Sequence, residues 1–229
     1  MHHSDYVPLH LHTEYSLLDG AIKIDELVET AAAMKMPAVA ITDHGNLFGA
    51  VEFYRKAVKA GIKPIIGCEV YVAPGSRHDR ARSAGEGAAF HLVLLARDND
   101  GYRNLITLVS RAFTEGFYYK PRIDRELLEQ YSGGLIGLTA CLKGEVPYYL
   151  RLGDLDKARE TALEYKRILG AGNFFLELQA NGLEEQEAVN RKLVQLSKEL
   201  HIGVVATNDC HYLKPGDARA HEILLCIQT

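Results

Sequence analysis

Ala38–His44 reads AVAITDH, an apolar run that ends in a threonine, a carboxylate and an imidazole. Near the end of the chain, Gly203–His211 reads GVVATNDCH and follows the same plan. An almost uninterrupted apolar run is typical of a parallel strand that is covered on both faces. Polar residues that follow such runs lie where the carboxyl ends of parallel strands converge. These stretches predict an α/β fold with functional side chains at its strand ends.

Seven apolar runs in the 229-residue chain predict strands, and helical patterns separate most of them. The predicted strands are Val7–Leu11, Ala38–Thr42, Pro64–Val72, Phe90–Ala96, Leu135–Thr139, Phe174–Leu178 and Gly203–Thr207. The predicted helices are Ile24–Lys35, Phe48–Ala60, Tyr102–Phe117, Asp124–Tyr131, Leu155–Leu169 and Glu184–Leu200, and another begins at Ala218. With no domain-like break over residues 1–229, this alternation favours one closed, parallel barrel over a doubly wound open sheet.

Composition limits the class of protein. Hydrophobic residues make up 47% and charged residues 24% of the chain, which is ordinary for a globular protein, and the net charge of −4 argues against a surface that coats nucleic acid. No apolar run approaches the roughly 20 residues of a membrane span, and no signal peptide opens the sequence. We therefore expect a cytoplasmic protein, with no membrane contact, whose four cysteines are reduced.

Two histidines end the first predicted strand. Because side chains alternate along a strand, His10 and His12 point to one face, and Leu9 and Leu11 point to the other. A pair in this spacing indicates a metal site more strongly than one core histidine does. Asp19, in the loop that follows, is either a further ligand or a turn residue.

Three further strands carry ligand-type residues. Asp43 and His44 are neighbours, so their side chains diverge, and we assign His44 to the metal and Asp43 to a supporting position behind a ligand. Glu69 lies in the apolar sequence CEVYV, where a buried carboxylate is costly unless it is paired or bound to metal. His91 begins its predicted strand rather than ending it. Either that strand boundary is wrong or the strand runs differently from the others.

The last ligand-type residues follow the fifth and seventh predicted strands. Cys141 would by itself be a small buried hydrophobe, and it becomes a candidate thiolate ligand because the other strand ends carry ligands. Asp209 and His211 share a face by strand alternation, whereas Cys210 points away and packs.

The candidate ligands form a mixed set: His10, His12, Asp19, His44, Glu69, His91, Cys141, Asp209 and His211. Nine ligands are too many for one tetrahedral ion and predict two or three divalent ions. Imidazoles suit Zn, Mn and Fe, carboxylates add Mn and Mg, and a thiolate favours Zn. Such a centre predicts hydrolysis of a phosphate ester by a metal-activated water. The sequence has no Walker loop and no GxSxG motif, which argues against covalent catalysis.

Basic residues in two loops are candidate substrate contacts. Lys120 and Arg122 follow Tyr118 and Tyr119, so this loop either stacks a base and holds a phosphate or simply packs. Lys143, two residues after Cys141, either meets a substrate phosphate or is a plain exposed lysine.

The segment Ala73–Ala89 has no periodicity and is rich in Gly, Ala, Ser and Arg, which predicts an irregular loop. It is either a solvated surface loop or a segment whose Arg77, Arg80 and Arg82 touch a phosphate backbone.

Six segments resemble the PHP (polymerase and histidinol phosphatase) domain, namely HLHTEYSLLDG, ITDHGNLFG, CEVYV, HLVLLA, LTACLKGEV and ATNDCHYL. Between them, YSLLDGA, GFYYKPRID and AHEILLCIQT resemble more specifically the amino-terminal domain of bacterial DNA polymerase III alpha subunits. The resemblance runs through essentially the whole chain. It implies a distorted (βα)7 barrel of the PHP type, with a trinuclear metal site at the carboxyl ends of the strands and the nine ligands named above.

The resemblance also implies a function. Because all nine ligand positions are kept here, it favours an active 3′–5′ exonuclease or phosphoesterase in replication proofreading. The expected partners are a DNA primer 3′ end, the remaining domains of the alpha subunit and a separate proofreading exonuclease subunit. The palm-domain aspartates of the family are absent, so this chain is not expected to polymerise DNA by itself.

Two other functions stay open. In one, the metals only staple a scaffold that stabilises the polymerase or docks the exonuclease subunit. In the other, the chain is a free-standing phosphomonoesterase that resembles histidinol phosphatase. The polymerase-like segments between the motifs argue against the second.

Overall fold

The computed structural model describes residues 3–80 and 89–228. Its strands form one curled sheet in the order β1-β2-β3-β5-β6-β7, with β4 beside β2. The strands are β1 (Ala38–Ile41), β2 (Lys63–Val72), β3 (Phe90–Ala96), β4 (Arg122–Ile123), β5 (Leu135–Leu138), β6 (Phe174–Gln179) and β7 (Gly203–Thr207). The helices are α1 (Ile24–Ala33), α2 (Ala50–Lys59), α3 (Asn99–Thr114), α4 (Arg125–Gln130), α5 (Glu145–Leu152), α6 (Leu155–Leu169), α7 (Glu184–Leu200) and α8 (Ala218–Gln228).

The segment Pro8–His12 joins the two edges of this sheet. On one side, the carbonyl oxygens of Pro8 and Leu11 accept hydrogen bonds of 2.9 and 2.8 Å from β1 and the residue after it. On the other side, Cys210, just beyond β7, exchanges two hydrogen bonds of 2.8 and 3.2 Å with the same segment. The curled sheet therefore closes into the predicted barrel through this segment.

The closing segment is not the regular strand that Val7–Leu11 predicts. Pro8 has no N–H to donate to a ladder, and the N–H of Leu11 donates to the Thr42 hydroxyl at 2.9 Å. Leu9 and Leu11 also pack in different core clusters, so the prediction that they share a face is wrong. The seventh strand is instead β4, whose two residues are too few to show any periodicity.

β3 runs antiparallel to both of its neighbours, which corrects the all-parallel prediction. Its register pairs His91 with Tyr71 of β2 and Val93 with Leu138 of β5. The other strand pairs are parallel. A reversed strand brings its first residues to the end of the barrel at which the other strands finish. His91 therefore lies at the start of its strand because that strand runs in the opposite direction.

A small apolar cluster fills the barrel interior: Leu9, Ala40, Ile65, Val93, Leu95, Ile136, Leu138, Ala140, Phe175 and Val205. Because side chains alternate along a strand, the same face also carries Glu69 on β2, His91 on β3 and Glu177 on β6. These three polar residues are 1%, 9% and 0% exposed. The strand period thus stacks an ionisable layer on top of an apolar one inside the barrel.

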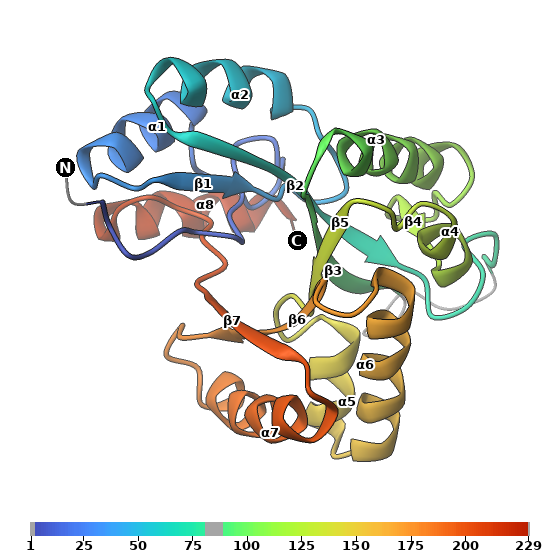
Figure 1. Cartoon of the computed structure of the whole chain (residues 1–229). Coiled ribbons are helices and arrows are strands. Elements are labelled where there is room, and N and C mark those ends of the chain that lie inside the picture. The colour runs from blue at the N-terminus through green and yellow to red at the C-terminus, as the bar shows by residue number, and fades with distance from the viewer. Residues whose placement is uncertain (1–2, 81–88, 229) are drawn as a thin grey trace.

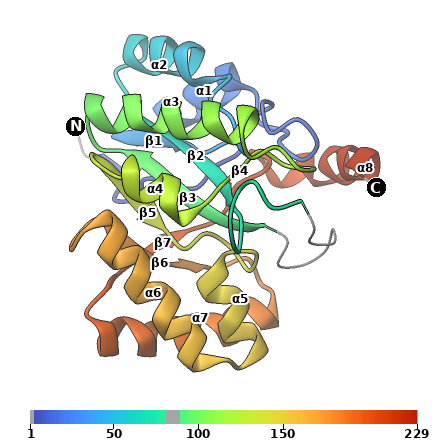
Figure 2. The same ribbon diagram turned by 90° about the vertical axis from the view of Figure 1, so that its right-hand side faces the viewer.

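Helices cover the outside of the sheet on two sides. Figure 1 shows α1 and α2 over β1 and β2, with α5, α6 and α7 grouped at the opposite side. Figure 2 shows the same separation from a view turned by 90°, with α3 on the side of α1 and α2. The larger core cluster joins β2, β3 and β6 to helices α3 to α7. Among the described residues, no helix is long and apolar enough to cross a bilayer.

The predicted helices all form, and α6 and α7 match their predicted bounds Leu155–Leu169 and Glu184–Leu200. α5 is an additional helix. Pro147 lies in its first turn, a position that tolerates proline although proline is otherwise a helix breaker. The described part of the segment Ala73–Ala89, up to residue 80, contains no helix or strand, as its composition predicts.

Candidate metal centre

Side chains from across the chain meet at one end of the barrel. Three groups of candidate ligands occur there: His12, His44 and His211; His10, His12 and Glu69; and His44, Glu69 and His91. Within each group the ligand-type atoms lie within 4.8 Å of one another. Because the groups share members, they form one continuous set, which with Asp19 and Asp209 we call the ligand cluster.

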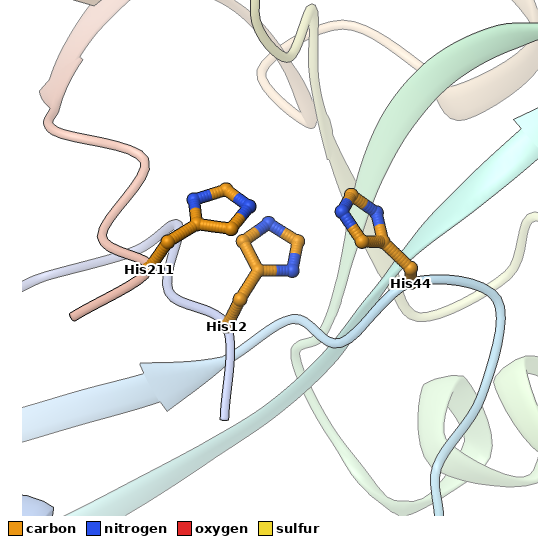
Figure 3. Close-up of side chains that lie close together, drawn as sticks. All are labelled: His12, His44 and His211. Atoms are coloured by element: carbon orange, nitrogen blue, oxygen red, sulfur yellow. The ribbon is translucent and has the colours of Figure 1, made fainter. Parts of the chain in front are cut away.

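Three imidazoles of the ligand cluster come from distant parts of the chain, and Figure 3 shows them side by side. His12 belongs to the segment that closes the barrel, His44 follows β1, and His211 follows β7. The ring centre of His12 lies 4.1 Å from that of His44 and 4.2 Å from that of His211. The fold therefore brings together histidines that the sequence separates by most of its length.

Glu69 lies at the centre of the ligand cluster. Its Oε2 is 2.6 Å from His44 Nδ1 and 3.5 Å from His12 Nε2. Its Oε1 is 2.9 Å from His91 Nδ1 and 3.4 Å from His10 Nε2. Each carboxylate oxygen thus faces two imidazoles, which is the arrangement of a carboxylate able to bridge two cations.

The ligand cluster fits a set of divalent cations better than it fits a hydrogen-bond network. Three of its buried atoms, His44 Nδ1, Glu69 Oε2 and Asp209 Oδ1, have no hydrogen-bond partner among residues 3–80 and 89–228. They nevertheless lie 2.6 to 3.2 Å from nitrogen or oxygen atoms of neighbouring cluster residues. Buried polar atoms without a partner are rare, and each needs a physical explanation. Lone pairs that converge on a common space are satisfied by a cation placed between them.

Asp209 and Asp19 complete the acidic part of the ligand cluster. Asp209 Oδ1 lies 3.2 Å from Nε2 of both His10 and His12. Asp209 has a left-handed backbone with φ of +50°, so a turn rather than strand alternation directs its side chain inward. Asp19 Oδ2 lies 3.1 Å from His44 Nε2. Both carboxylates therefore face imidazoles of the ligand cluster.

Cys141 lies at the margin of the ligand cluster. Its sulfur is 3.9 Å from His91 Nδ1, and it follows Ala140, whose φ is +58°. Burial, followed by the negative charges of Glu69 and Asp209, raises the pKa of the Cys141 thiol well above its usual range. In the metal-free protein this thiol is therefore protonated at neutral pH. Cys210 packs against an apolar cluster, as expected.

Asp43 lies behind the ligand cluster and contacts it through Ser16. Its carboxylate accepts hydrogen bonds from the Thr13 N–H at 2.6 Å, the Thr13 hydroxyl at 2.9 Å and the Ser16 hydroxyl at 2.9 Å. The Ser16 hydroxyl in turn lies 3.0 Å from His12 Nδ1. This chain of contacts orients the His12 ring, which fits the supporting position predicted for Asp43.

Glu177 is a site residue that the sequence reasoning overlooked. It is fully buried, and its Oε1 lies 2.6 Å from His10 Nδ1 while also accepting hydrogen bonds from Gln179 Nε2 at 3.0 Å and from the Thr207 hydroxyl. A carboxylate behind a ligating histidine fixes the tautomer and orientation of the ring. The available signal was the one used for Glu69, an acidic residue within an apolar strand.

Protonation in the metal-free ligand cluster differs between its histidines. Burial alone would lower the pKa of His10, but Asp209, Glu177 and Glu69 outweigh it and hold that pKa well above the usual value. Burial also opposes the charge of His44, but Glu69 and Asp19 raise its pKa to about 9.

His12 behaves in the opposite way, because burial and the neighbouring His44 lower its pKa to about 3. The protonated rings of His10 and His44 therefore balance part of the negative charge of the carboxylates in the ligand cluster.

Lys120, Lys143 and Arg122, the predicted substrate contacts, lie in different surroundings. Lys120 Nζ lies 5.3 Å from the centre of the Tyr71 ring, which itself packs 6.0 Å from the ring of His44. Lys143 is exposed, and its carbonyl oxygen accepts the His91 N–H at 3.0 Å. Lys120 therefore lies beside the ligand cluster, whereas for Lys143 the structure places the backbone next to His91.

Arg122 does not fit its predicted phosphate contact. It is 4% exposed, and its guanidinium donates to the backbone carbonyl oxygens of Gly116, Arg77 and Asp79 at 2.8 to 3.1 Å. Its positive charge also lies over the Tyr118 ring, 5.2 Å from the centre. These contacts tie a loop together, so Arg122 is a structural residue.

Arg77 is likewise buried, at 8% exposure, and pairs with Glu115 at 2.8 Å and with Asp124 at 3.0 Å. It is not the phosphate contact that one interpretation of its loop suggested. Arg80 is exposed, and Arg82 lies outside the described residues.

Comparison with known proteins agrees with this architecture. Residues 8–181 match the PHP domain family. Over 229 residues the chain is 50% identical to the DNA polymerase III subunit alpha of Aquifex aeolicus, covering 98% of this chain and 20% of that protein. Over 227 residues it is 52% identical to the corresponding subunit of Thermus aquaticus, covering 98% of this chain and 18% of that protein. The chain therefore spans about a fifth of the length of these curated relatives.

Solved structures share the fold at low sequence identity. An amidohydrolase from Chromobacterium violaceum aligns with a TM-score of 0.56 at 16% identity, over 95% of this chain and 96% of that one. A two-domain protein from Bacteroides vulgatus, described as containing a predicted PHP-like metal-dependent phosphoesterase, aligns with a TM-score of 0.53 at 14% identity, over 90% and 51% of the two chains. These likenesses confirm the fold, and the match over residues 8–181 settles the family. The chain belongs to the PHP domain family.

Proposed function

We propose that this chain is a metal-dependent phosphoesterase domain that removes nucleotides from a DNA 3′ end within a replicative polymerase alpha subunit. The observation that carries the proposal is the position of Glu69, with each carboxylate oxygen facing two imidazoles. The relatives named DNA polymerase III subunit alpha support DNA and the rest of such a subunit as partners, and we extend the proposal to a separate proofreading exonuclease subunit.

The nine residues predicted as ligands would hold two or three divalent ions, with zinc, manganese or iron preferred and magnesium possible from the carboxylates. They are His10, His12, Asp19, His44, Glu69, His91, Cys141, Asp209 and His211. When bound, such ions lower the pKa of a coordinated water toward about 7 and neutralise charge on a phosphate.

The protein's own residues contribute orientation and charge. Glu177 and Asp43 hold the rings of His10 and His12, directly and through Ser16. Lys120 adds a positive charge beside the ligand cluster, where it attracts the phosphate of an incoming strand. The apolar interior below Glu69 excludes water from the base of the site.

A second function, a metal-stapled scaffold, is favoured by one observation. The ligand cluster takes residues from the closing segment and from both sheet edges that this segment joins. Metal bound there would strengthen the closure of the barrel whether or not it hydrolyses anything. A free-standing phosphomonoesterase has less support, because the close sequence similarity is to polymerase subunits.

The test uses the full chain loaded with Mn²⁺ or Zn²⁺. We expect it to release nucleotides from 3′-mismatched DNA and to leave a small phosphomonoester intact. His12→Ala should abolish the release, and His78→Ala, which removes an exposed histidine outside the ligand cluster, should not. Metal-loaded protein without activity, but with a higher Tm than the metal-free form, would support the scaffold instead. Hydrolysis of the monoester alone would support the phosphatase.

A further inference from the structure

A pocket of about 210 Å³ opens beside the ligand cluster, and the proposed function gives no role to its apolar lining. Asp19 and His44 of the ligand cluster line it together with the apolar side chains of Leu17, Phe48 and Phe113. One lining thus combines residues of the ligand cluster, which would attract a phosphate through the cations they hold, with groups that attract a flat apolar surface.

The apolar part of this lining is exposed to an unusual degree. Leu17 is 68%, Phe48 61% and Phe113 40% exposed. The rings of Phe48 and Phe113 lie 6.4 Å apart, and Phe113 stacks on Phe117 at 6.1 Å with an angle of 25°. Single exposed hydrophobic residues are normal, whereas a contiguous exposed group next to a charged site indicates a binding surface.

The wall between the ligand cluster and the aromatic rings is firmly built. Tyr71, Lys120 and Pro121 also line the pocket. Gly45 has φ of +63°, and a Cβ there would meet Pro121 Cγ at 2.8 Å and the Tyr71 ring at 3.2 Å. The backbone at Gly45 thus packs directly against this wall, so the pocket is formed before any ligand arrives.

The positive charge of Lys120 lies on the side of the pocket that is next to the ligand cluster. Lys120 Nζ lies over the Tyr71 ring, and Tyr71 packs against His44 and His91. A positive group therefore stands at the boundary between the ligand cluster and the pocket. A ligand with a phosphate at one end and an aromatic ring at the other matches this order, because the phosphate meets the cationic side and the ring meets Phe48 and Phe113.

We propose that this pocket binds the base of the 3′-terminal nucleotide whose phosphate lies at the ligand cluster. The inference rests on the proposed function and specifies its substrate. Bases of any sequence stack on aromatic side chains, so the pocket gives recognition without sequence preference. Its volume of about 210 Å³ is below the roughly 300–1,000 Å³ of pockets for drug-sized ligands, which leaves room for a single base.

A base held in this pocket has left its partner strand. The substrate is therefore an unpaired terminal nucleotide, either in single-stranded DNA or at a frayed or mismatched end, for which unstacking and unpairing are least costly. The pocket admits only a base that is not paired, so its shape selects unpaired 3′ ends.

The first experiment measures binding to the Mn²⁺-loaded full chain by calorimetry. The probes are thymidine 5′-monophosphate and deoxyribose 5-phosphate, which carry the same phosphate with and without a base. We expect the nucleotide to bind about tenfold more tightly or better. Phe48→Ala and Phe113→Ala should reduce this preference to about twofold or less and leave the affinity for the sugar phosphate unchanged, while Phe113→Trp should keep it. Tyr54→Ala, which removes an exposed aromatic residue outside the pocket, is the matched control.

The second experiment compares unpaired 3′ ends that carry a terminal thymine or an abasic residue. We expect slower removal of the abasic residue, and a difference between the two ends that Phe113→Ala removes. Equal binding of the two small probes, or equal rates on the two ends, would overturn the base pocket while leaving phosphodiester hydrolysis in place. An absence of hydrolysis from either end, with the binding preference intact, would instead overturn the proposed function and keep the base pocket.

Discussion

Glu177 Oε1 lies 2.6 Å from Nδ1 of His10, and neither side chain is exposed to solvent. The contact turns the other ring nitrogen, Nε2, toward the ligand cluster, 3.2 Å from Asp209 Oδ1. A carboxylate in this position fixes the tautomer of a ligating histidine and increases its basicity. A residue outside the candidate ligand set is therefore expected to control how strongly the site holds metal.

Glu177→Gln should weaken metal binding by about 10- to 100-fold, because the amide keeps the size of the side chain but loses its charge. Competition with a chelating dye measures this affinity. Glu187→Gln, on the exposed face of α7, is the matched control and should bind metal like the parent protein. Unchanged affinity in Glu177→Gln would show that the contact with His10 has only a structural role.

Glu69→Gln should have the larger effect on chemistry. Each oxygen of Glu69 faces two imidazoles, so removing its charge disturbs more than one cation position. We expect at least about a 100-fold loss of phosphodiester hydrolysis, equivalent to about 2.7 kcal/mol, and a lower metal content per chain. Elemental analysis alongside the rate measurement checks both. Full metal content together with full activity would show that the Glu69 carboxylate is not needed to hold the cations.

The stability of the metal-free protein should depend on pH through His44. Its folded pKa is raised from 6.5 to about 9, so its stabilising contribution is fully present below pH 6.5 and is lost as the pH rises through about 9. Melting curves of chelator-treated protein between these values should show a falling Tm. His44→Gln should flatten this dependence. Saturating Mn²⁺ should flatten it too, because metal binding requires the unprotonated ring. An equally steep fall in His44→Gln would assign the effect to another group.

Substitutions of Arg122 and Lys120 should have different effects, the first on stability and the second on substrate binding. Arg122→Ala leaves three carbonyl contacts unmade, two of them buried, and should lower the free energy of unfolding by about 2 kcal/mol in a denaturant titration. Lys120→Ala should leave stability nearly unchanged, raise KM for DNA and reduce the salt dependence of binding. The reverse pattern, a stable Arg122→Ala with weakened DNA binding, would restore the phosphate contact predicted from the sequence.

The regular elements were accessible from the sequence because their patterns are local. Leu155–Leu169 and Glu184–Leu200 carry helical periodicity over four turns or more, and their predicted bounds hold. The direction of β3 was not accessible in this way, because alternation looks the same in both directions along a strand. The position of His91 at the start of its strand was the one local sign of the reversal.

For the candidate site, too, local patterns in the sequence identified some residues, and only the folded structure showed the role of others. The spacing of His10 and His12 and the apolar setting of Glu69 were sufficient to single out these side chains. Glu177 was overlooked although FFLELQ carries the same signal, because its partner His10 is 167 positions away. Arg122 was misassigned for a related reason, since only the folded structure shows that its donors already serve backbone carbonyl oxygens.

The backbone pairing between the segment Pro8–His12 and Cys210 sets an order of events during synthesis. Nearly the whole chain lies between the two partners, so the barrel remains open on the ribosome until the residues after β7 have emerged. Contacts of such long sequence separation form slowly, because the entropy of loop closure opposes them. Asp209 and His211 emerge together with Cys210, so a nascent chain lacks the complete ligand cluster until the barrel can close.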